Sequence, residues 1–362
     1  MIKKIDKWLL LPIIILSIIG LLMVYSASNV VGKANYNDSL YYFKRQLLFM
    51  CIGYIIMIVI MRLDINVVKR FASLFFIFSL FLLILVIIPG IGVVRGGARS
   101  WIGIGTFSLQ PSEFMKIALI IFLARYLDNN YLDLRKTKHL IYLSILICLI
   151  FGLIMIQPDF GTGLVIVLSC FCLLFASGAN LKFFICLLIG GIIGISILII
   201  SAPYRMERIL AYLDPWSDPL GSGFQGIQSL FAITPGGLFG HGFNKSIQKH
   251  FFLPEPQNDF IFAIVVEEFG LIGGLIVIGL FFTIIYRAFI LSTRMENKFS
   301  MFLMIGLSLT LAVQIFINIG VVIGLLPVTG ITLPMFSYGG SSLIINFISF
   351  GIMLCASKYR EY

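Results

Sequence analysis

Long apolar runs recur along almost the whole chain, and short polar segments separate them. Ten runs come close to the roughly 20 residues that an α-helix needs to cross the hydrocarbon core of a bilayer. They lie at residues 8–26, 46–61, 71–89, 112–126, 139–156, 160–178, 182–200, 260–286, 300–325 and 340–357. The pattern predicts an all-α integral membrane protein with about ten transmembrane helices, forming a single polytopic membrane domain over residues 1–362.

The polar segments at 90–111, 157–159, 201–258 and 326–339 differ from the other connections. All except the tight turn at 157–159 are rich in Gly, Pro and aromatic residues. Segments of this composition usually fold back against the protein and line a cavity. The segment 201–258 is by far the longest, and it leads directly into an apolar run. We therefore expect the chemistry of the protein at this loop.

The composition agrees with a membrane location. Hydrophobic residues make up 60% of the chain, charged residues 12%, and the mean hydropathy is +1.06. A soluble domain would be about one quarter charged. The first run follows three lysines, but no cleavage pattern clearly follows it, so we interpret it as a retained helix. All six cysteines fall inside apolar runs, which favours a packing role over disulfides or zinc.

The net charge of +10 could suggest a nucleic-acid partner, but its distribution indicates membrane topology. With the N-terminus inside, the inner loops hold 16 Lys and Arg residues, the outer loops hold 9, and Lys116 lies within a span. This bias follows the positive-inside rule. We expect both termini in the cytoplasm of a multi-pass membrane protein, with the 201–258 loop as one large extracytoplasmic loop.

Asp259 is the first candidate for chemistry. It immediately precedes the run Phe260-Ile261-Phe262-Ala263, where an N-cap residue is expected. The Glu or Gln that would complete a capping box is missing at Phe262. From position alone the cap interpretation is favoured. The apolar neighbours would also raise the pKa of the carboxyl group toward the range that suits a general base, so a cap and a base are compatible.

Other ionisable residues lie inside or beside the predicted spans. Glu267 and Glu268 are about 100° apart on a helix. A charge at that depth costs about 3 kcal/mol, so a buried partner is at least as plausible as catalysis. Glu113 and Lys116 are three residues apart and can pair, or Lys116 can neutralise an anionic ligand. Asp159 lies in a short turn, where capping the next helix is the default interpretation.

The large loop carries carboxylates and cations together, the latter being Arg205, Arg208, Lys245 and Lys249. Arg and Lys both suit phosphate, Arg through bidentate geometry. With Glu255 nearby and lipid adjacent, the loop would suit a lipid-linked phosphate substrate. A solvated mixed-charge loop is the alternative. The three histidines are scattered, and no nucleotide-binding or metal-binding motif is present.

Several motifs, in order along nearly the whole chain, resemble the SEDS family (shape, elongation, division and sporulation), which contains RodA, FtsW and SpoVE. They are Gly97-Ala98-Arg99-Ser100-Trp101-Ile102, Gln110-Pro111-Ser112-Glu113, Gln157-Pro158-Asp159-Phe160-Gly161-Thr162, Asp218 to Gln225, Leu253-Pro254-Glu255 with Asp259-Phe260-Ile261-Phe262-Ala263, Glu267-Glu268, and Ser337-Tyr338-Gly339-Gly340-Ser341-Ser342. Details of the large loop are more similar to the FtsW and SpoVE branch than to the elongation branch.

The resemblance implies a peptidoglycan glycosyltransferase that polymerises lipid II on the outer face of the bacterial cytoplasmic membrane, with undecaprenyl diphosphate leaving. It implies that Asp259 is the essential carboxylate. The residues expected to bind substrate are Glu113, Lys116, Arg99, Asp159, Arg205, Arg208, Lys245, Lys249, Glu255, Glu267 and Ser337. No cofactor is certain, although a divalent cation, Mg or Mn, could assist. The expected partners are a class B penicillin-binding protein acting as transpeptidase and other divisome or elongasome membrane proteins.

Two other functions are compatible with the same sequence. A lipid II flippase could use Glu113, Lys116 and Glu267 as relay groups within the membrane, since such residues often mark translocation paths. A non-catalytic scaffold for the transpeptidase is the third possibility. The enzyme is favoured because the polar residues gather toward the outer side, whereas a flippase needs matched sites on both faces.

The charge distribution gives a direct test of orientation. We predict that a reporter enzyme fused within residues 214–250 is active only outside the cytoplasm, and one fused within 128–138 only inside, because the Lys and Arg bias orients the spans. Reporter activity in whole cells measures this. The reverse pattern would contradict both the orientation and an outward-facing site.

Overall fold

The computed structural model describes residues 5–95, 98–104, 107–131, 137–178 and 180–360. Gly97 of the first family motif, and Lys3, Lys4, Arg135 and Lys136 among the predicted inner charges, lie outside these residues. Ten helices correspond one to one with the predicted spans. They are α1 (Lys7–Tyr36), α2 (Tyr41–Arg62), α3 (Ile65–Leu85), α4 (Pro111–Asn129), α5 (Thr137–Ile156), α6 (Phe160–Ala176), α7 (Leu181–Ile200), α10 (Ile261–Ser292), α11 (Lys298–Val322) and α12 (Gly340–Ala356).

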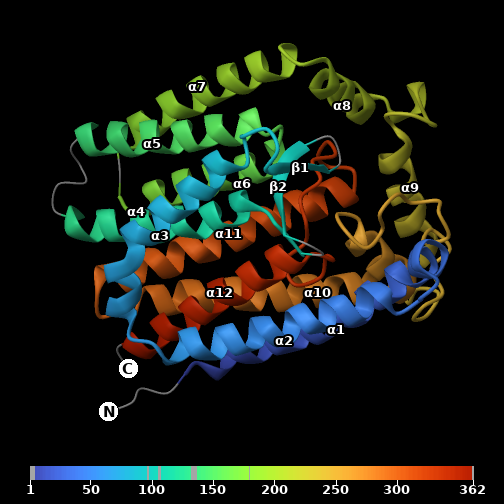
Figure 1. Ribbon diagram of the computed structural model, residues 1–362, viewed down its shortest axis with the longest axis horizontal. Helices are drawn as coiled ribbons and strands as arrows, with labels where there is room; N and C mark the ends of the chain where they lie inside the picture. Colours follow the sequence, from blue (N-terminus) through green and yellow to red (C-terminus); the bar gives the residue numbers. More distant parts are fainter. Residues whose placement is uncertain (1–4, 96–97, 105–106, 132–136, 179, 361–362) are drawn as a thin grey trace.

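The helices form one bundle in which they run side by side (Figure 1). Among the described residues, seven helices are long and apolar enough by themselves to cross a membrane, and α6 and α7 contain shorter apolar stretches. The α4 helix carries more charge, but it packs against α3, α6, α11 and α12, which bury most of its side chains. The prediction of an all-α membrane protein with about ten spans is confirmed.

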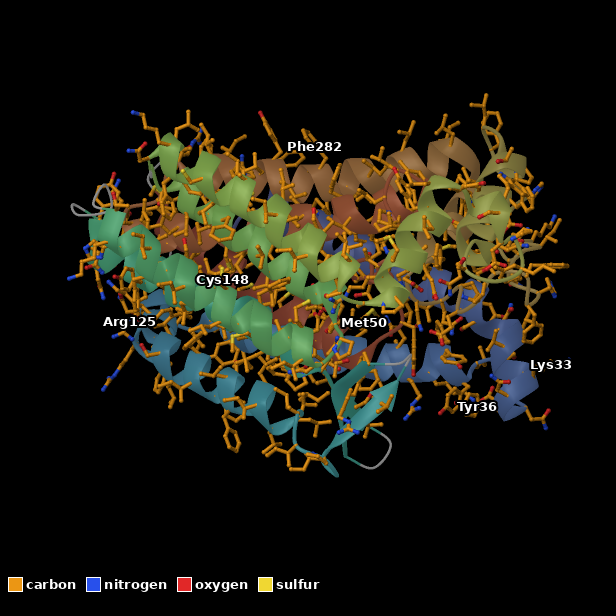
Figure 2. The ribbon with its side chains drawn as sticks, turned by 90° about the horizontal axis from the view of Figure 1, so that it is seen from above. Lys33, Tyr36, Met50, Arg125, Cys148 and Phe282 are labelled. Carbon is orange, nitrogen blue, oxygen red and sulfur yellow. The ribbon has the colours of Figure 1, made fainter. Side chains whose placement is uncertain are left out.

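The two ends of the bundle differ in what they carry. Both termini lie at one end, and the large loop with its helices α8 (Pro203–Leu213) and α9 (Phe224–Ile233) lies at the other (Figure 1). Figure 2 places Arg125 at the end with the termini, and Lys33 and Tyr36 at the loop end. This arrangement agrees with the assignment of Arg125 and Lys33 to opposite sides of the membrane by charge. Phe282 projects sideways from the bundle, as expected of a residue facing lipid (Figure 2).

A small antiparallel sheet is an addition to the predicted helices. It consists of β1 (Gly92–Arg95), β2 (Ala98–Ile104) and β3 (Phe107–Leu109), in that order. Gly92 pairs with Ile102, which pairs in turn with Leu109. The Ser341 hydroxyl donates to the carbonyl oxygen of Ser108 at 2.8 Å and ties the sheet to the start of α12. Part of the predicted 90–111 loop is therefore ordered by strand pairing.

The α10 helix is broken at Gly270, whose φ of 67° and ψ of −168° interrupt the helical ladder. Residues 236–242 restore the lost hydrogen bonds. The amides of His241 and Gly242 donate to the carbonyl oxygens of Glu267 and Glu268 at 3.0 and 2.8 Å. In return, the amides of residues 271 and 272 donate to carbonyl oxygens of residues 237 and 238. A helix break within a membrane is tolerated because neighbouring groups satisfy the freed backbone.

The break requires glycine for two reasons, and this can be tested. A Cβ at Gly270 would lie 2.3 Å from the carbonyl oxygen of Leu238, and its positive φ disfavours L-residues. Gly270→Ala should therefore lower the thermal stability of the purified protein by several degrees, equivalent to about 2 kcal/mol from overpacking and strain. Gly279 in the same helix has open space around its Cβ position, so Gly279→Ala is the control. Equal melting temperatures for the two variants would contradict the prediction.

Candidate active site

The large loop folds back against the end of the bundle opposite the termini, as its composition suggested. The Tyr212 hydroxyl at the end of α8 donates to the carbonyl oxygen of Leu325 at 2.9 Å. The Ser229 hydroxyl in α9 donates to the carbonyl oxygen of Val322 at 2.7 Å. Val322 is the last residue of α11 and Leu325 lies just beyond it, so these hydrogen bonds attach the loop to the bundle.

The backbone around Asp259 is held by two other parts of the chain. The Asn318 amide nitrogen, near the C-terminal end of the apolar helix α11, donates at 2.7 Å to the carbonyl oxygens of both Asp259 and Ile331. The Ser337 hydroxyl donates to the carbonyl oxygen of Asn258 at 2.6 Å and accepts from the amide of residue 333. These contacts fix the position of Asp259 through its backbone.

The interpretation of Asp259 as a helix cap is wrong. The N-cap of α10 is Phe260, one residue later, and no side chain makes a capping hydrogen bond there. The hydrogen bond to the Asp259 carboxylate comes from its own backbone amide. Among the described residues, no other group donates to this carboxylate. It is therefore not engaged in holding the helix.

The surroundings of Asp259 raise its pKa from 3.8 to about 7. Burial is the main cause, and the negative charge of Glu255 adds to it. The hydrogen bond from the Asp259 amide and the positive charge of Arg208 both lower this pKa, but by less than burial raises it. The side chain nevertheless keeps partial contact with solvent. A carboxyl group with a pKa near 7 can accept a proton efficiently at neutral pH.

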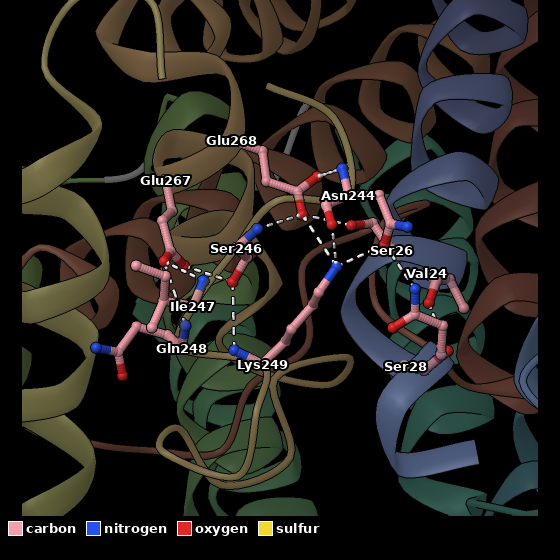
Figure 3. Close-up of polar contacts among 11 residues, drawn as sticks. Val24, Ser26, Ser28, Asn244, Ser246, Ile247, Gln248, Lys249, Glu267 and Glu268 are labelled. Atoms are coloured by element: carbon pink, nitrogen blue, oxygen red, sulfur yellow. Dashed lines mark hydrogen bonds and ion pairs between the residues drawn. The ribbon is translucent and has the colours of Figure 1, made fainter. Parts of the chain in front are cut away.

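Glu267 and Glu268 hold residues of the large loop in place (Figure 3). The Glu267 carboxylate accepts from the Ser246 hydroxyl and from the amides of residues 247 and 248 at 2.5 to 3.2 Å. The Glu268 carboxylate accepts from the Ser26 hydroxyl and from the amides of residues 244 and 246, and it lies 3.7 Å from the Lys249 amine. Both glutamates are at most 1% exposed. The prediction of buried partners is confirmed, and the substrate-binding roles of Glu267 and Lys249 remain predictions.

Glu113 and Lys116 also have internal partners. They form an ion pair at 2.9 Å, and the Lys116 amine donates to the Gln314 side-chain oxygen at 2.7 Å. Gln314 in turn donates to the carbonyl oxygen of Thr332 at 2.9 Å. The pair is thus a structural link between α4, α11 and the loop before α12.

Asp159 caps α6, as predicted from its turn. Its carboxylate accepts from the amide of Thr162 at 3.3 Å. It also accepts from the side chains of Gln110 and Ser112 at 2.8 and 3.0 Å. These contacts join the starts of α4 and α6.

The cations of the predicted site separate into two groups. Arg208 on α8 is exposed, donates to the carbonyl oxygen of Val328 at 3.2 Å and interacts with the charge of Asp259. Arg205 lies one turn earlier on α8, and Lys245 and Arg99 are exposed. The buried Lys249 belongs instead to the Glu268 contacts. The structure brings Asp259, Glu255, Arg208 and Ser337 together, and it uses the other carboxylates to hold the scaffold.

Comparison with known proteins now identifies the group to which the chain belongs. Residues 7–362 match the FtsW/RodA/SpoVE family of cell cycle proteins. The chain is 48% identical to stage V sporulation protein E of Bacillus subtilis (strain 168), over 99% of each protein. It is 40% identical to a probable peptidoglycan glycosyltransferase FtsW of Saccharophagus degradans, over 95% of this chain and 90% of the relative. The chain belongs to the FtsW/RodA/SpoVE family.

Solved structures agree with this membership. The fold is similar to that of a chain studied for the coordination of polymerization and crosslinking by a peptidoglycan synthase complex, with a TM-score of 0.78, 27% identity and 99% of both chains covered. The rod shape determining protein RodA of Thermus thermophilus gives a TM-score of 0.74 and 25% identity over 99% of this chain and 98% of RodA. The resemblance to the SEDS family is confirmed, with higher identity to the SpoVE and FtsW relatives than to RodA.

Two residues of the site in this family member were missed in the sequence. The side chain of Asn318 donates to the carbonyl oxygen of Asp259, and Gln46 on α2 donates to the carbonyl oxygen of Ser337 at 3.2 Å. Both amides are buried, at 1% exposure. For Asn318, a polar amide within an apolar run is the signal that could have identified it, because such a group needs a partner inside the membrane. Gln46 directly follows Lys44 and Arg45 at the edge of its run, so the sequence gives no comparable signal there.

The raised pKa of Asp259 makes stability depend on pH in a defined direction. Between about pH 4 and 7 the folded protein retains a proton on Asp259 that the unfolded chain releases, so stability should fall as pH rises through this window. Asp259→Asn removes the effect and should be more stable than the wild type at pH 8, with the difference shrinking toward pH 4. Thermal unfolding from pH 4 to 8 measures this.

Asp218→Asn is the matched control for this measurement. Hydrogen bonds from the Ser222 amide and hydroxyl lower the pKa of Asp218. Asp218 is therefore ionised throughout the pH 5 to 8 range, and its replacement should leave the slope there unchanged. A wild-type stability that rises between pH 5 and 7, while Asp259→Asn shows the same rise, would contradict the raised pKa.

Proposed function

We propose that Asp259 is the general base of a reaction that joins lipid II units into glycan strands. The chain is a peptidoglycan glycosyltransferase of the FtsW/RodA/SpoVE family. The observation that carries the proposal is a carboxyl group with a pKa of about 7 that has no capping duty and that other segments hold through its backbone. It lies at the end of the bundle where substrate and product can reach the large loop.

The chemistry follows from this placement. The C4 hydroxyl of one disaccharide attacks the anomeric carbon of another, and Asp259 takes the hydroxyl proton as the new bond forms. The bond from the anomeric carbon to the phosphate oxygen breaks, and the diphosphate leaves with the electron pair. Arg208, and the other exposed cations of the loop, offset the charge that develops there. The rigid backbone at Asp259 provides orientation, which lowers the barrier further.

The residues around Asp259 also suit a divalent cation. The side-chain oxygens of Gln257, Asn258 and Asn318 are buried and accept no hydrogen bond. Together with Glu255 and Asp259 they are oxygen donors, the kind that Mg²⁺ prefers. These residues would hold the ion, and it would supply positive charge opposite the leaving diphosphate.

Orientation and partners follow the family and the charge pattern. The bias of Lys and Arg supports cytoplasmic termini and an active site outside, in contact with the outer leaflet that presents lipid II. The similar chain in the peptidoglycan synthase complex supports a class B penicillin-binding protein as partner, since crosslinking is the transpeptidase reaction. Other divisome or elongasome proteins would then assemble around this pair.

The alternative of a lipid II flippase has less support. Its expected relay groups Glu113 and Lys116 are paired with each other and buried. The cavity beside Lys116 measures about 10 Å³, which is close to the smallest space that holds one water molecule. A headgroup would need far more room, so these residues favour a scaffold role over a translocation path.

The base role predicts a specific mutational result. Asn has nearly the size of Asp but cannot accept a proton near neutral pH, so Asp259→Asn should lower lipid II polymerisation by at least about a hundredfold. Asp259→Glu should keep partial activity, because the carboxylate is displaced by about one methylene. Polymerisation of labelled lipid II by the purified protein with its partner transpeptidase measures this.

Asp214→Asn, an exposed carboxylate on the same loop, is the matched control and should retain activity. Each variant is checked by gel filtration and by its binding to the partner, so that a folding defect is recognised. In the wild type, activity should rise about tenfold per pH unit below pH 7 and level off above it, following ionisation of Asp259. Near-normal polymerisation by Asp259→Asn would refute the base role.

A further inference from the structure

Four tyrosines form a continuous aromatic surface beside the site. Tyr36 ends α1 and stacks on Tyr41 at the start of α2, with ring centres 3.7 Å apart and planes within 8°. The Tyr42 ring stands edge-on to Tyr41 at 5.3 Å and to Tyr338 at 4.9 Å. Tyr36 is 50% exposed and lies at the loop end of the bundle (Figure 2). We call these four residues the tyrosine platform.

The platform is rigid before any ligand arrives. Arg45, one turn along α2, places its guanidinium 5.2 Å from the centre of the Tyr41 ring and donates to the Tyr41 hydroxyl at 2.6 Å. It also hydrogen-bonds the side chain of Tyr338. The four-residue turn below is fixed by Asp38, whose carboxylate accepts from the amide of Leu40 at 2.9 Å. Rings held in place in this way lose little conformational entropy on binding.

The platform adjoins the proposed base. The amide of Tyr338 donates to the carbonyl oxygen of Gln257 at 2.8 Å, which is two residues before Asp259. Glu255 interacts electrostatically with both Tyr42 and Asp259. The aromatic surface therefore adjoins the segment of the chain that carries Asp259.

Tyrosines are also common at the membrane interface, where they anchor helix ends. Two features separate the platform from such a belt. Tyr338 belongs to the loop before α12, which is folded against Gln257. Arg45 is held against the rings, whereas an interfacial anchor leaves its cations free to reach the headgroups. The arrangement is that of a binding surface with polar groups at its edge.

We propose that the tyrosine platform binds the sugar rings of the glycan next to Asp259, an inference that rests on the proposed glycosyltransferase function. A pyranose has a flat face of C–H groups and an edge of hydroxyl and acetamido groups. Its face packs on an aromatic ring, and its edge accepts and donates hydrogen bonds to tyrosine hydroxyls and nearby charged groups. The half-exposed Tyr36 ring, with the hydroxyl and guanidinium groups of Tyr41 and Arg45 beside it, matches this pattern.

Binding of a lipid-free saccharide tests the platform without any catalytic step. The probe is an N-acetylglucosamine tetrasaccharide, titrated by NMR against the full chain in detergent micelles in the Asp259→Asn background. Tyr36→Leu keeps apolar area and removes the flat ring, and it should weaken binding about tenfold, which corresponds to about 1.4 kcal/mol. Tyr36→Phe keeps the ring and should bind within about twofold of its parent.

Tyr286→Leu is the control, because Tyr286 is similarly exposed, at 56%, on α10 far from the platform. Tetrasaccharide binding by Tyr36→Leu at the affinity of its parent, or no binding by the parent at millimolar concentration, would overturn the proposal and leave the tyrosines as interfacial anchors only. Equal losses in Tyr36→Leu and Tyr286→Leu would overturn it too. The proposed function is tested separately by lipid II polymerisation with the unmodified Asp259.

Discussion

A peptide group that leaves the helical ladder inside a bilayer must form its hydrogen bond within the protein, and this constraint shapes the half of the molecule that carries the large loop. The break in α10 is closed by residues 236–242. The loop before α12 is closed by Asn318 and Ser337, and it passes so close to α1 that a Cβ on Gly20 would lie 2.2 Å from the carbonyl oxygen of Met335. Asn318 and Ser337 also donate to the carbonyl oxygens of Asp259 and Asn258, so the position of the proposed base depends on satisfied backbone groups.

Buried charged groups, like buried peptide groups, need partners within the protein. Burying a carboxylate is costly unless donors surround it, and the chain places its donors around carboxylates that hold the scaffold. Glu268 accepts from two amides and the Ser26 hydroxyl and lies beside Lys249, and Glu113 pairs with Lys116. Asp259 is left with its own amide and the more distant charge of Arg208. Its ionisation is therefore disfavoured, and this makes it a proton acceptor near neutral pH.

The sequence predicted the spans well because a 20-residue apolar run has few structural alternatives in a membrane. It also predicted the Glu113–Lys116 pair and the Asp159 cap, since both depend on short-range spacing. It did not predict the strand pairing in 92–109 or the contacts of Asn318, which depend on segments far apart in the chain. Local chemistry identified Asp259 as a candidate but favoured a cap, and the resemblance to a known family favoured the role of a base.

Asp159 and Asp259 show how one position relative to a helix separates two roles. Asp159 is the N-cap of α6 and accepts from an amide of that helix. The same carboxylate accepts from the side chains of Gln110 and Ser112, so it holds the starts of α4 and α6 together. Asp259 precedes its helix by one residue more, because Phe260 occupies the cap position. Because of this one-residue difference, the Asp259 carboxylate lies beside an apolar helix but accepts no hydrogen bond from the amides of that helix. Burial is therefore the main cause of its raised pKa.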